Sequence, residues 1–472
     1  MKKTSLLCIA FILSIGFVVA QDGTYDTSFG DNGVVYTDID QQIEVFYAVA
    51  QSPSGKIAVA GESLGETEIE SFIVMYLEDG TIDTSFADNG FLREQSDNEF
   101  ENIDFQSNGK LLVYGNFNGF DKVARLLPNG TLDTTFADNG YMTNGSGTYL
   151  MIDVNDRILT TTTQNGSISL MRYLPDGALD TSFGTNGSIV FVSGANSNIS
   201  LKYLENGKLL IYYNSTENGN TLKYIARFMP DGSLDLNFGT NGRAELPIED
   251  FIGCKIFSFN DESILVSCSG WNPDTLDFLR KTLKLTAQGD LDTNFSTNGV
   301  LNGKTVELIQ QNQRFITNSG PVDYEGGTNI VFRRFFNNGD LDTTFQFEPA
   351  PEIIERSFKS MITNSGKLLI AANNMGLHAF QDILLFQYNN NPLSITNKNT
   401  TSIAIVPNPS NGIFNLKSQE PIYSPYTVSD INGRILLTGT FEGIENELDL
   451  SSFSKGVYFL NNLSSTFQLL VK

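Results

Sequence analysis

Residues 132–140 read Leu132-Asp133-Thr134-Thr135-Phe136-Ala137-Asp138-Asn139-Gly140, a signature that recurs along the chain: an apolar or aromatic residue, Asp, Phe three positions later, then Asn-Gly. Its copies begin at Asp26, Asp83, Asp133, Asp180, Asp235, Asp292 and Asp342, at spacings of 57, 50, 47, 55, 57 and 50 residues. The matching aromatic residues are Phe29, Phe86, Phe136, Phe183, Phe238, Phe295 and Phe345. Glu348-Pro349 replaces Asn-Gly in the seventh copy. A fixed period of this length indicates a repeat architecture.

Each interval between signatures contains β-forming runs separated by turns. One example is Lys110 to Tyr114 after Ser107-Asn108-Gly109, followed by Lys122 to Leu127, which ends in Pro128-Asn129-Gly130. Four antiparallel strands per unit are typical of a propeller blade. We therefore predict an all-β protein, whose repeats form a seven-bladed β-propeller of four-stranded blades. Six or eight blades are the alternatives if one unit is irregular.

A straight solenoid is the main rival architecture. Solenoids need atypical capping repeats at their ends, yet the first unit opens directly on its signature at Asp26. The last unit ends on Ile383 to Tyr388 without a following signature. This offset predicts that an N-terminal strand completes the last blade, which removes both sheet edges.

Residues 22–391 resemble the delta-60 repeat, a bacterial β-propeller repeat. The resemblance is carried by the signature and by a Gln-x-x-Gly-Lys-Ile/Leu-Leu hairpin, present as Gln51 to Ile57 and as Gln106 to Leu112. It implies a propeller fold and supplies no catalytic signature.

Residues 1–20 have the features of a signal peptide. Lys2 and Lys3 precede an apolar run from Leu6 to Val19, and we expect cleavage between Ala20 and Gln21. An uncleaved anchor is the alternative, but about 14 apolar residues are too few to cross a bilayer. No later stretch is long and apolar enough to span a membrane, so we expect no transmembrane segment.

The mature chain is strongly acidic. Without Lys2 and Lys3, 28 basic residues remain against 54 acidic ones, a formal charge of −26. Such a surface repels phosphate backbones, so we expect no nucleic-acid partner. It also attracts divalent cations weakly.

The repeated Asp has a structural and a metal-binding interpretation. Five units carry a cation at a matching position near the end of their fourth run: Arg125, Arg172, Arg227, Lys284 and Arg334. We predict that this cation pairs with the signature Asp between neighbouring strands or blades. A ring of ligand-binding arginines is one alternative, and calcium bound by the Asp turns is another. We otherwise expect no cofactor and no metal.

Candidate catalytic residues are scarce. His378 is the only histidine, which leaves almost no material for His-based metal sites or triads. Cys254 and Cys268 remain after signal cleavage, and a three-residue turn at 260–262 would place them directly opposite each other. A disulfide and two buried thiols are equally compatible with this arrangement.

After a linker at residues 392–402, the pattern changes. Residues 403–472 contain motifs at Pro407, Asn408, Pro409, Gly412, Asp430, Gly433, Gly456 and Tyr458. These resemble the type A C-terminal sorting domain of the type IX (Por) secretion system of Bacteroidota, a small β-sandwich. The resemblance implies that the domain engages the type IX machinery. It also implies export through the periplasm and across the outer membrane, to the cell surface or the medium.

Three classes of function remain. The leading hypothesis is a monomeric binding or adhesion module for an extracellular glycan or protein. The alternatives are a purely structural surface protein and a secreted hydrolase or lyase with carboxylates in the propeller funnel, so an enzymatic role is open and disfavoured.

Overall fold

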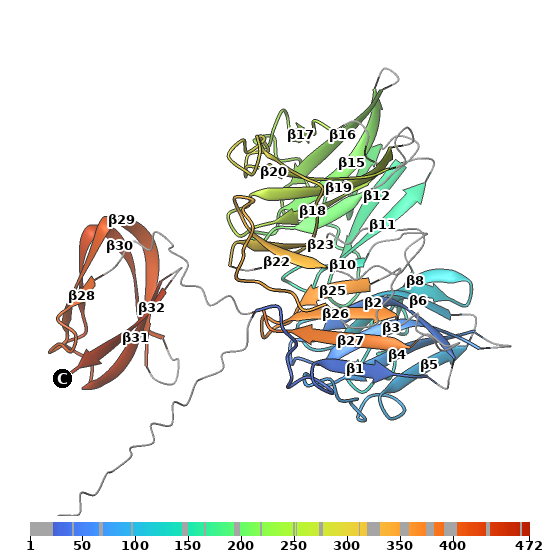
Figure 1. Ribbon diagram of the computed structural model, residues 1–472, viewed down its shortest axis with the longest axis horizontal. Helices are drawn as coiled ribbons and strands as arrows, with labels where there is room; N and C mark the ends of the chain where they lie inside the picture. The colour runs from blue at the N-terminus through green and yellow to red at the C-terminus, as the bar shows by residue number, and fades with distance from the viewer. Residues whose placement is uncertain are drawn as a thin grey trace, which may run out of the picture. The chain divides into compact units, whose positions relative to one another are not determined.

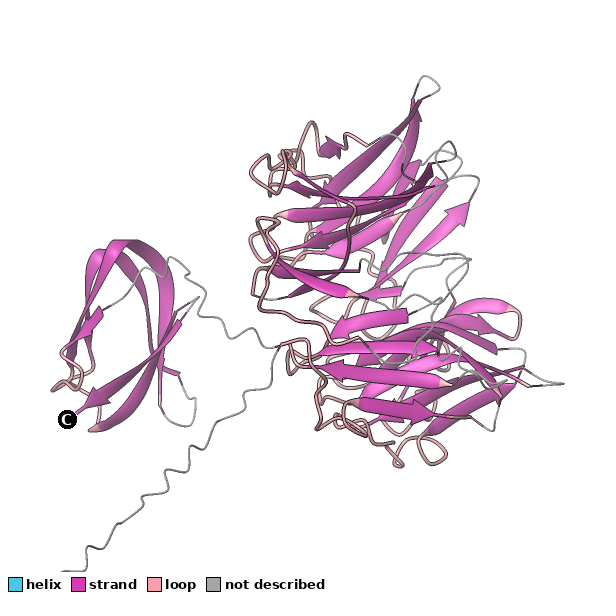
Figure 2. Ribbon diagram, viewed as in Figure 1, coloured by secondary structure: helices cyan, strands magenta, loops and turns pink. Residues whose placement is uncertain are grey.

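A computed structural model describes residues 22–39, 42–65, 69–95, 98–143, 150–164, 167–192, 199–217, 220–248, 251, 253–272, 277–310, 312–318, 331–349, 358–373, 382–390, 404–430, 435–462 and 465–472. The chain divides into two compact units, Met1–Pro392 and Leu393–Lys472. The described residues form strands and turns and contain no α-helix (Figures 1 and 2). No helix able to cross a membrane occurs among them. The predicted signal peptide and its cleavage site, Ala20-Gln21, lie outside the described residues, as does the linker at 392–402.

Unit 1 contains seven described antiparallel sheets. In the hydrogen-bonded order of their strands, they are β1 (Val34–Thr37), β27 (Ile383–Tyr388), β26 (Leu368–Asn373) and β25 (Phe358–Ile362); β2 (Ile43–Gln51), β3 (Ile57–Leu64), β4 (Ile69–Tyr76) and β5 (Phe91–Gln95); β6 (Asn98–Phe105), β7 (Leu111–Phe117), β8 (Phe120–Leu126) and β9 (Tyr141–Thr143); β10 (Leu150–Ile152), β11 (Ile158–Gln164), β12 (Ser167–Tyr173) and β13 (Ser188–Val192); β14 (Ser200–Tyr203), β15 (Leu209–Glu217), β16 (Asn220–Phe228) and β17 (Arg243–Glu245); β18 (Gly253–Ser258), β19 (Ile264–Asn272), β20 (Asp277–Leu285) and β21 (Val300–Asn302); β22 (Thr305–Gln310), β23 (Arg314–Asn318) and β24 (Phe332–Phe336).

The first strand of the chain completes the sheet formed by the last three strands of unit 1. Strand β1 pairs with β27 in the register Val34↔Phe386 to Thr37↔Ile383. This is the N-terminal closure that the offset of the repeats predicts. We call β1-β27-β26-β25 the closing sheet.

Hydrophobic clusters join the sheets into a ring. Each of seven clusters combines apolar side chains of two successive sheets. The cluster that joins the closing sheet to the β2-β5 sheet contains Leu369, Leu385, Phe46, Ile57 and Val59. A solenoid has no contact between its first and last repeats, so this cluster favours the propeller.

One sheet departs from the predicted four strands. Six sheets have four strands, whereas β22-β23-β24 has three within the described residues. In the other repeats the outer strand follows two positive-φ residues, such as Asn139 (φ 52°) and Gly140 (φ 97°). The seventh signature has Glu348-Pro349 there, and proline cannot adopt a positive φ. The seventh signature therefore lacks the turn that precedes the outer strand in the other repeats.

The packing of the signature Phe requires a glycine in the following repeat. Phe136 is fully buried, and its ring lies against Gly177. A Cβ on Gly177 would come within 2.8 Å of the Phe136 ring, and Gly177 has φ 88°. Both the backbone conformation and the close approach require glycine here. The Phe thus packs one repeat against the turn of the next.

Unit 2 is a small β domain built around one core. Its strands are β28 (Ala404–Val406), β29 (Ile413–Ser429), β30 (Ile435–Asp449), β31 (Gly456–Asn462) and β32 (Ser465–Val471). The first part of β29 pairs with β28 and its last part with β31, while β30 follows its other edge. The sheet encloses buried side chains that include Phe414, Val428 and Leu460.

Candidate functional site

The signature Asp forms an ion pair at the hairpin-turn end of the sheets, where β2 turns into β3. Asp133 Oδ2 accepts hydrogen bonds from Arg125 Nε and Lys110 Nζ, both at 2.8 Å. Its Oδ1 accepts from the Thr135 hydroxyl at 2.6 Å and from the Thr135 amide at 3.1 Å. Arg125 also donates to the Pro175 carbonyl of the next sheet at 2.7 Å. The cation thus joins two sheets.

Each signature Asp forms an ion pair, with the residue equivalent to Arg125 in five repeats and with the lysine equivalent to Lys110 in the repeats of Asp26 and Asp83. The cation–carboxylate pairs are Lys367–Asp26, Lys56–Asp83, Arg125–Asp133, Arg172–Asp180, Arg227–Asp235, Lys284–Asp292 and Arg334–Asp342. The Arg125 guanidinium lies 4.4 Å from the centre of the Phe136 ring, so the cation also stacks on the buried aromatic residue. Burial alone would raise the pKa of the Asp133 carboxyl. Hydrogen bonds from Lys110 and Thr135 and the charge of Arg125 outweigh this effect and hold the pKa below its usual value. These contacts engage the oxygen atoms that a calcium ion would need.

The other end of the sheets carries charged residues that do not belong to this repeated network. Because strands alternate in direction, β2 begins, β3 ends and β4 begins at this end. We call it the loop end. Two groups of charged residues lie there on different sheets.

A basic cluster occupies the loop end of three successive sheets. Its members are Lys255 on β18, Arg280 on β20, Lys304 just before β22, Arg333 on β24 and Lys359 on β25. Each lies near the start of its strand. Five cations together are unexpected in so acidic a chain.

A pocket of about 360 Å³ lies within the basic cluster. Its lining includes Lys255, Arg280, Ser267, Ser269 and the carboxylate-bearing Glu307. Ammonium, guanidinium and hydroxyl groups therefore converge on one concave surface, as in sites that bind carboxylates or sulfates.

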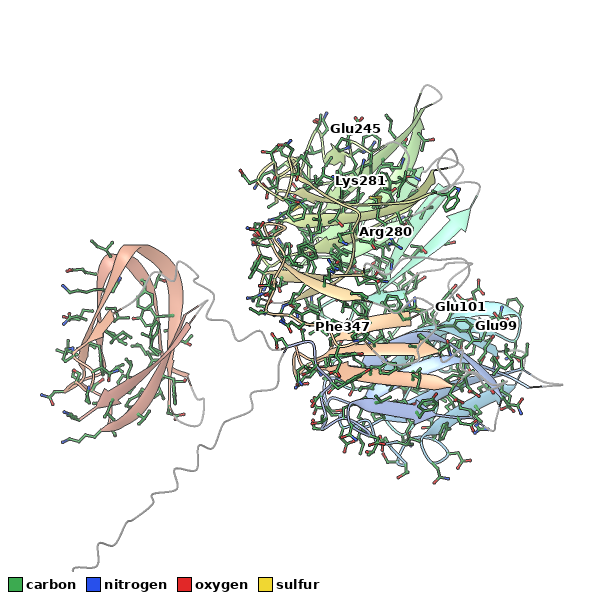
Figure 3. The ribbon with its side chains drawn as sticks, viewed as in Figure 1. Glu99, Glu101, Glu245, Arg280, Lys281 and Phe347 are labelled. Atoms are coloured by element: carbon green, nitrogen blue, oxygen red, sulfur yellow. A yellow bond between two sulfur atoms is a disulfide. The ribbon has the colours of Figure 1, made fainter. Side chains whose placement is uncertain are left out.

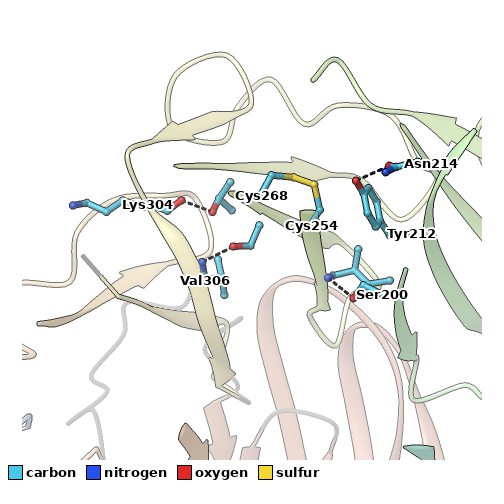
Figure 4. Close-up of a disulfide and its surroundings, with 10 residues drawn as sticks. Ser200, Tyr212, Asn214, Cys254, Cys268, Lys304 and Val306 are labelled. Carbon is cyan, nitrogen blue, oxygen red and sulfur yellow. Dashed lines mark hydrogen bonds between the residues drawn. A yellow bond between two sulfur atoms is a disulfide. The ribbon is translucent and has the colours of Figure 1, made fainter. Parts of the chain in front are cut away.

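A disulfide supports the wall of this pocket. Cys254 and Cys268 are directly opposite each other on β18 and β19, and their Sγ atoms are bonded (Figure 4). Cys254 lines the pocket. The Ser267 hydroxyl accepts a hydrogen bond from the Val306 amide at 2.8 Å, which holds β22 against β19. The pocket is thus built on braced strands.

Electrostatic repulsion between the cations of the basic cluster favours the binding of an anion. Desolvation, and then the like charges of Arg333 and Arg280, lower the pKa of Lys304. Desolvation and the charge of Lys255 lower the pKa of Lys359. Burial raises the pKa of the Glu307 carboxyl, and the surrounding cations offset part of this effect. A bound anion would relieve the repulsion between the cations.

An acidic cluster lies at the loop end of the first two sheets. Its members are Glu62 on β3, Glu99 and Glu101 on β6, and Asp121 on β8. Figure 3 shows Glu99 and Glu101 well separated from Arg280. Burial, and then its acidic neighbours, raise the pKa of Glu101. The two clusters give the loop end a strong charge asymmetry.

The sequence singled out the signature and missed both clusters. Successive members of the basic cluster are 24 to 29 residues apart and follow no motif, so only the ring brings them together. His378 lies outside the described residues.

Three sorting-domain motif residues make hydrogen bonds within unit 2. Asn408 Oδ1 accepts a hydrogen bond from the Leu470 amide at 3.0 Å. The Gly412 carbonyl accepts one from the Leu450 amide at 2.7 Å. Tyr458 is buried, and its hydroxyl donates to the Ser454 carbonyl at 2.6 Å. Pro407, Pro409, Asp430 and Gly456 lie on described segments, and Gly433 lies outside them.

Two known families match parts of the chain. Residues 404–472 match the secretion system C-terminal sorting domain. Residues 52–86, 106–136, 159–183 and 204–238 match a β-propeller domain of unknown function, DUF5122. Each of these four segments ends on a signature Phe. The predicted resemblances to a propeller repeat and to a sorting domain are confirmed.

Solved structures show distant similarity. Polysaccharide lyase Uly1 is 10% identical with a TM-score of 0.47, over 80% of this chain and 94% of that chain. The WD40 domain of Toxoplasma gondii coronin is 8% identical with a TM-score of 0.44, over 80% and 90%. A protein of unknown function from Dyadobacter fermentans DSM 18053 is 8% identical with a TM-score of 0.39, over 76% and 100%. No curated protein matches the sequence.

Proposed function

Because this chain is a β-propeller protein that the type IX secretion system exports to the cell surface or the medium, we propose that it is a binding module for an acidic extracellular glycan. The pocket between Lys255, Arg280 and Glu307 is the binding site. The observation that carries the proposal is a concave cluster of cations in a chain of formal net charge −24.

The chemistry of the pocket supports a glycan ligand. Lysine and arginine side chains bind carboxylates or sulfates, and Ser267 and Ser269 offer hydroxyl groups to sugar hydroxyls. Glu307 adds an acceptor for a sugar O–H group beside the cations. A short acidic oligosaccharide carries few negative charges, and these can all lie near the cations of the pocket. A long nucleic acid would extend beyond the pocket, where the acidic surface repels its phosphates.

Thermal unfolding of the mature chain against a panel of glycans tests this function. We expect oligogalacturonate, alginate oligomers or a sulfated oligosaccharide to raise the unfolding midpoint, because a ligand of the folded state stabilises it by about 2.7 kcal/mol at 100 times its Kd. Neutral xylo-oligosaccharides serve as the control and should have no effect. A panel in which no acidic glycan shifts the midpoint would favour the structural alternative. Release of shortened products would instead establish an enzyme.

A further inference from the structure

Three carboxylates from distant parts of the chain meet where the ring closes. Asp38 follows β1, Glu44 is the second residue of β2, and Asp382 immediately precedes β27. One carboxylate oxygen of each lies within 4.8 Å of the other two. Two of these residues belong to segments flanking strands of the closing sheet, and Glu44 belongs to the neighbouring β2-β5 sheet.

Glu44 lacks the partners that a buried carboxylate normally has. Its exposed fraction is 0%, and neither side-chain oxygen has a hydrogen-bond partner. The backbone amides of Ile39 and of Glu44 itself lower the pKa of this carboxyl, but they offset only part of the increase that burial causes. By contrast, Glu62 on the next strand accepts a hydrogen bond from the Tyr47 hydroxyl at 2.8 Å. An unpaired buried carboxylate costs several kcal/mol unless a proton or a cation neutralises it.

We propose that Asp38, Glu44 and Asp382 form a calcium site at the seam between the closing sheet and the β2-β5 sheet. Calcium takes oxygen ligands at about 2.3–2.6 Å, so oxygens on opposite sides of one ion are about 4.6–5.2 Å apart. Carboxylate oxygens within 4.8 Å of one another meet this requirement. Magnesium needs a tighter octahedron at about 2.1 Å. Water and backbone oxygens complete the coordination of calcium.

The position of the site gives it a structural role. Asn373 at the end of β26 already donates a hydrogen bond to the Glu44 carbonyl across this seam, at 2.7 Å. An ion held by all three carboxylates links the β1–β2 connection, β2 and the start of β27. Since the first strand closes the ring by pairing with β27, calcium would secure that closure. This role is independent of the basic pocket.

Protons and calcium compete for the site. Burial, and then the charges of Asp382 and Asp38, raise the pKa of the Glu44 carboxyl from 4.5 to about 8. Between these values the folded protein binds a proton that the unfolded chain has released, so this group makes stability fall as the pH rises through the window. Calcium replaces the proton and removes the repulsion. The stabilising effect of calcium should therefore be larger above the raised pKa than below it.

The test uses the mature chain, with and without calcium. Its thermal unfolding is measured in chelator and in millimolar calcium, at a pH below and a pH above that of the Glu44 titration. We expect calcium to raise the midpoint of the wild type, with a larger shift at the higher pH and a smaller one for magnesium. Glu44→Gln keeps the shape of the side chain, should be at least as stable as the wild type in chelator at the higher pH, and should lose the calcium response. Glu101→Gln in the acidic cluster is the matched control and should retain it.

Calorimetric titration of calcium counts the bound ions in the same three proteins. We expect one ion per chain at this site in the wild type and in Glu101→Gln, and at least about a tenfold loss of affinity in Glu44→Gln. A wild type without calcium binding overturns the proposal. Equal binding by Glu44→Gln, or a loss confined to Glu101→Gln, overturns it too, because the ion would then bind elsewhere.

Discussion

Deletion of residues 393–472 should leave the propeller inside the cell, in the periplasm, with no protein detected at the surface or in the medium. The deleted segment is the compact unit that contains the match to the sorting domain at residues 404–472. Unit 1 keeps all seven of its intersheet clusters after the deletion, so the truncated protein should fold. Immunoblots of periplasmic, surface and medium fractions measure the outcome.

A single substitution in the sorting domain tests whether retention results from the loss of the sorting signal or merely from the shortening of the chain. Gly412→Val should reproduce the retention, because Gly412 has φ 114° and a Cβ there would lie 2.5 Å from Ser451 Cα. Lys417→Ala removes one side of an exposed ion pair with Glu445 and should be exported normally. Export of the truncated chain at the wild-type level would contradict the sorting role.

Substitution of Phe136 by Ala should lower the free energy of unfolding of the propeller by about 3–5 kcal/mol. The ring is fully buried, lies against Gly177 of the next repeat and stacks under the Arg125 guanidinium. Its removal leaves a cavity between two sheets and removes the aromatic ring on which the buried Arg125 guanidinium stacks. Chemical denaturation followed by tryptophan and far-ultraviolet signals measures the change.

Phe120→Ala is the matched control for this prediction. Phe120 has an exposed fraction of 67% and lies at the start of β8 in the same sheet. Its substitution should change the free energy of unfolding by no more than about 0.5 kcal/mol. A change this small for Phe136→Ala as well would contradict the placement of the signature Phe between repeats.

The repeated features could be predicted from the sequence because each is local. Asp133, Phe136 and Gly140 lie within nine residues, the Asp and Phe recur in all seven units and the Gly in six, so one turn determines the pairing of strands and the packing of the ring. The closing strand followed from the offset between the first signature and the last run. The three-stranded sheet of the described residues has a local counterpart in the sequence, because Pro349 stands where the other repeats have a positive φ.

The candidate sites could not be predicted because they depend on closure. Glu44 and Asp382 are 338 positions apart in the sequence and come together only when β1 pairs with β27. The cations of the basic cluster come from three sheets, and none belongs to the signature. Non-local contacts of this kind have no periodic signal in a single chain.

Calorimetric titration of the mature chain with an acidic oligosaccharide tests the binding function most directly. The comparison is between the wild type, the double variant Lys255→Ser/Arg280→Ser and the control Lys122→Ser, whose ammonium lies near the Tyr141 ring, outside the pocket lining. Each charge-assisted contact contributes about 1.5–3 kcal/mol, so we predict that the double variant binds at least about 100-fold more weakly than the wild type and that Lys122→Ser binds normally. Equal affinity in the wild type and the folded double variant would contradict the assignment of the basic pocket as the binding site.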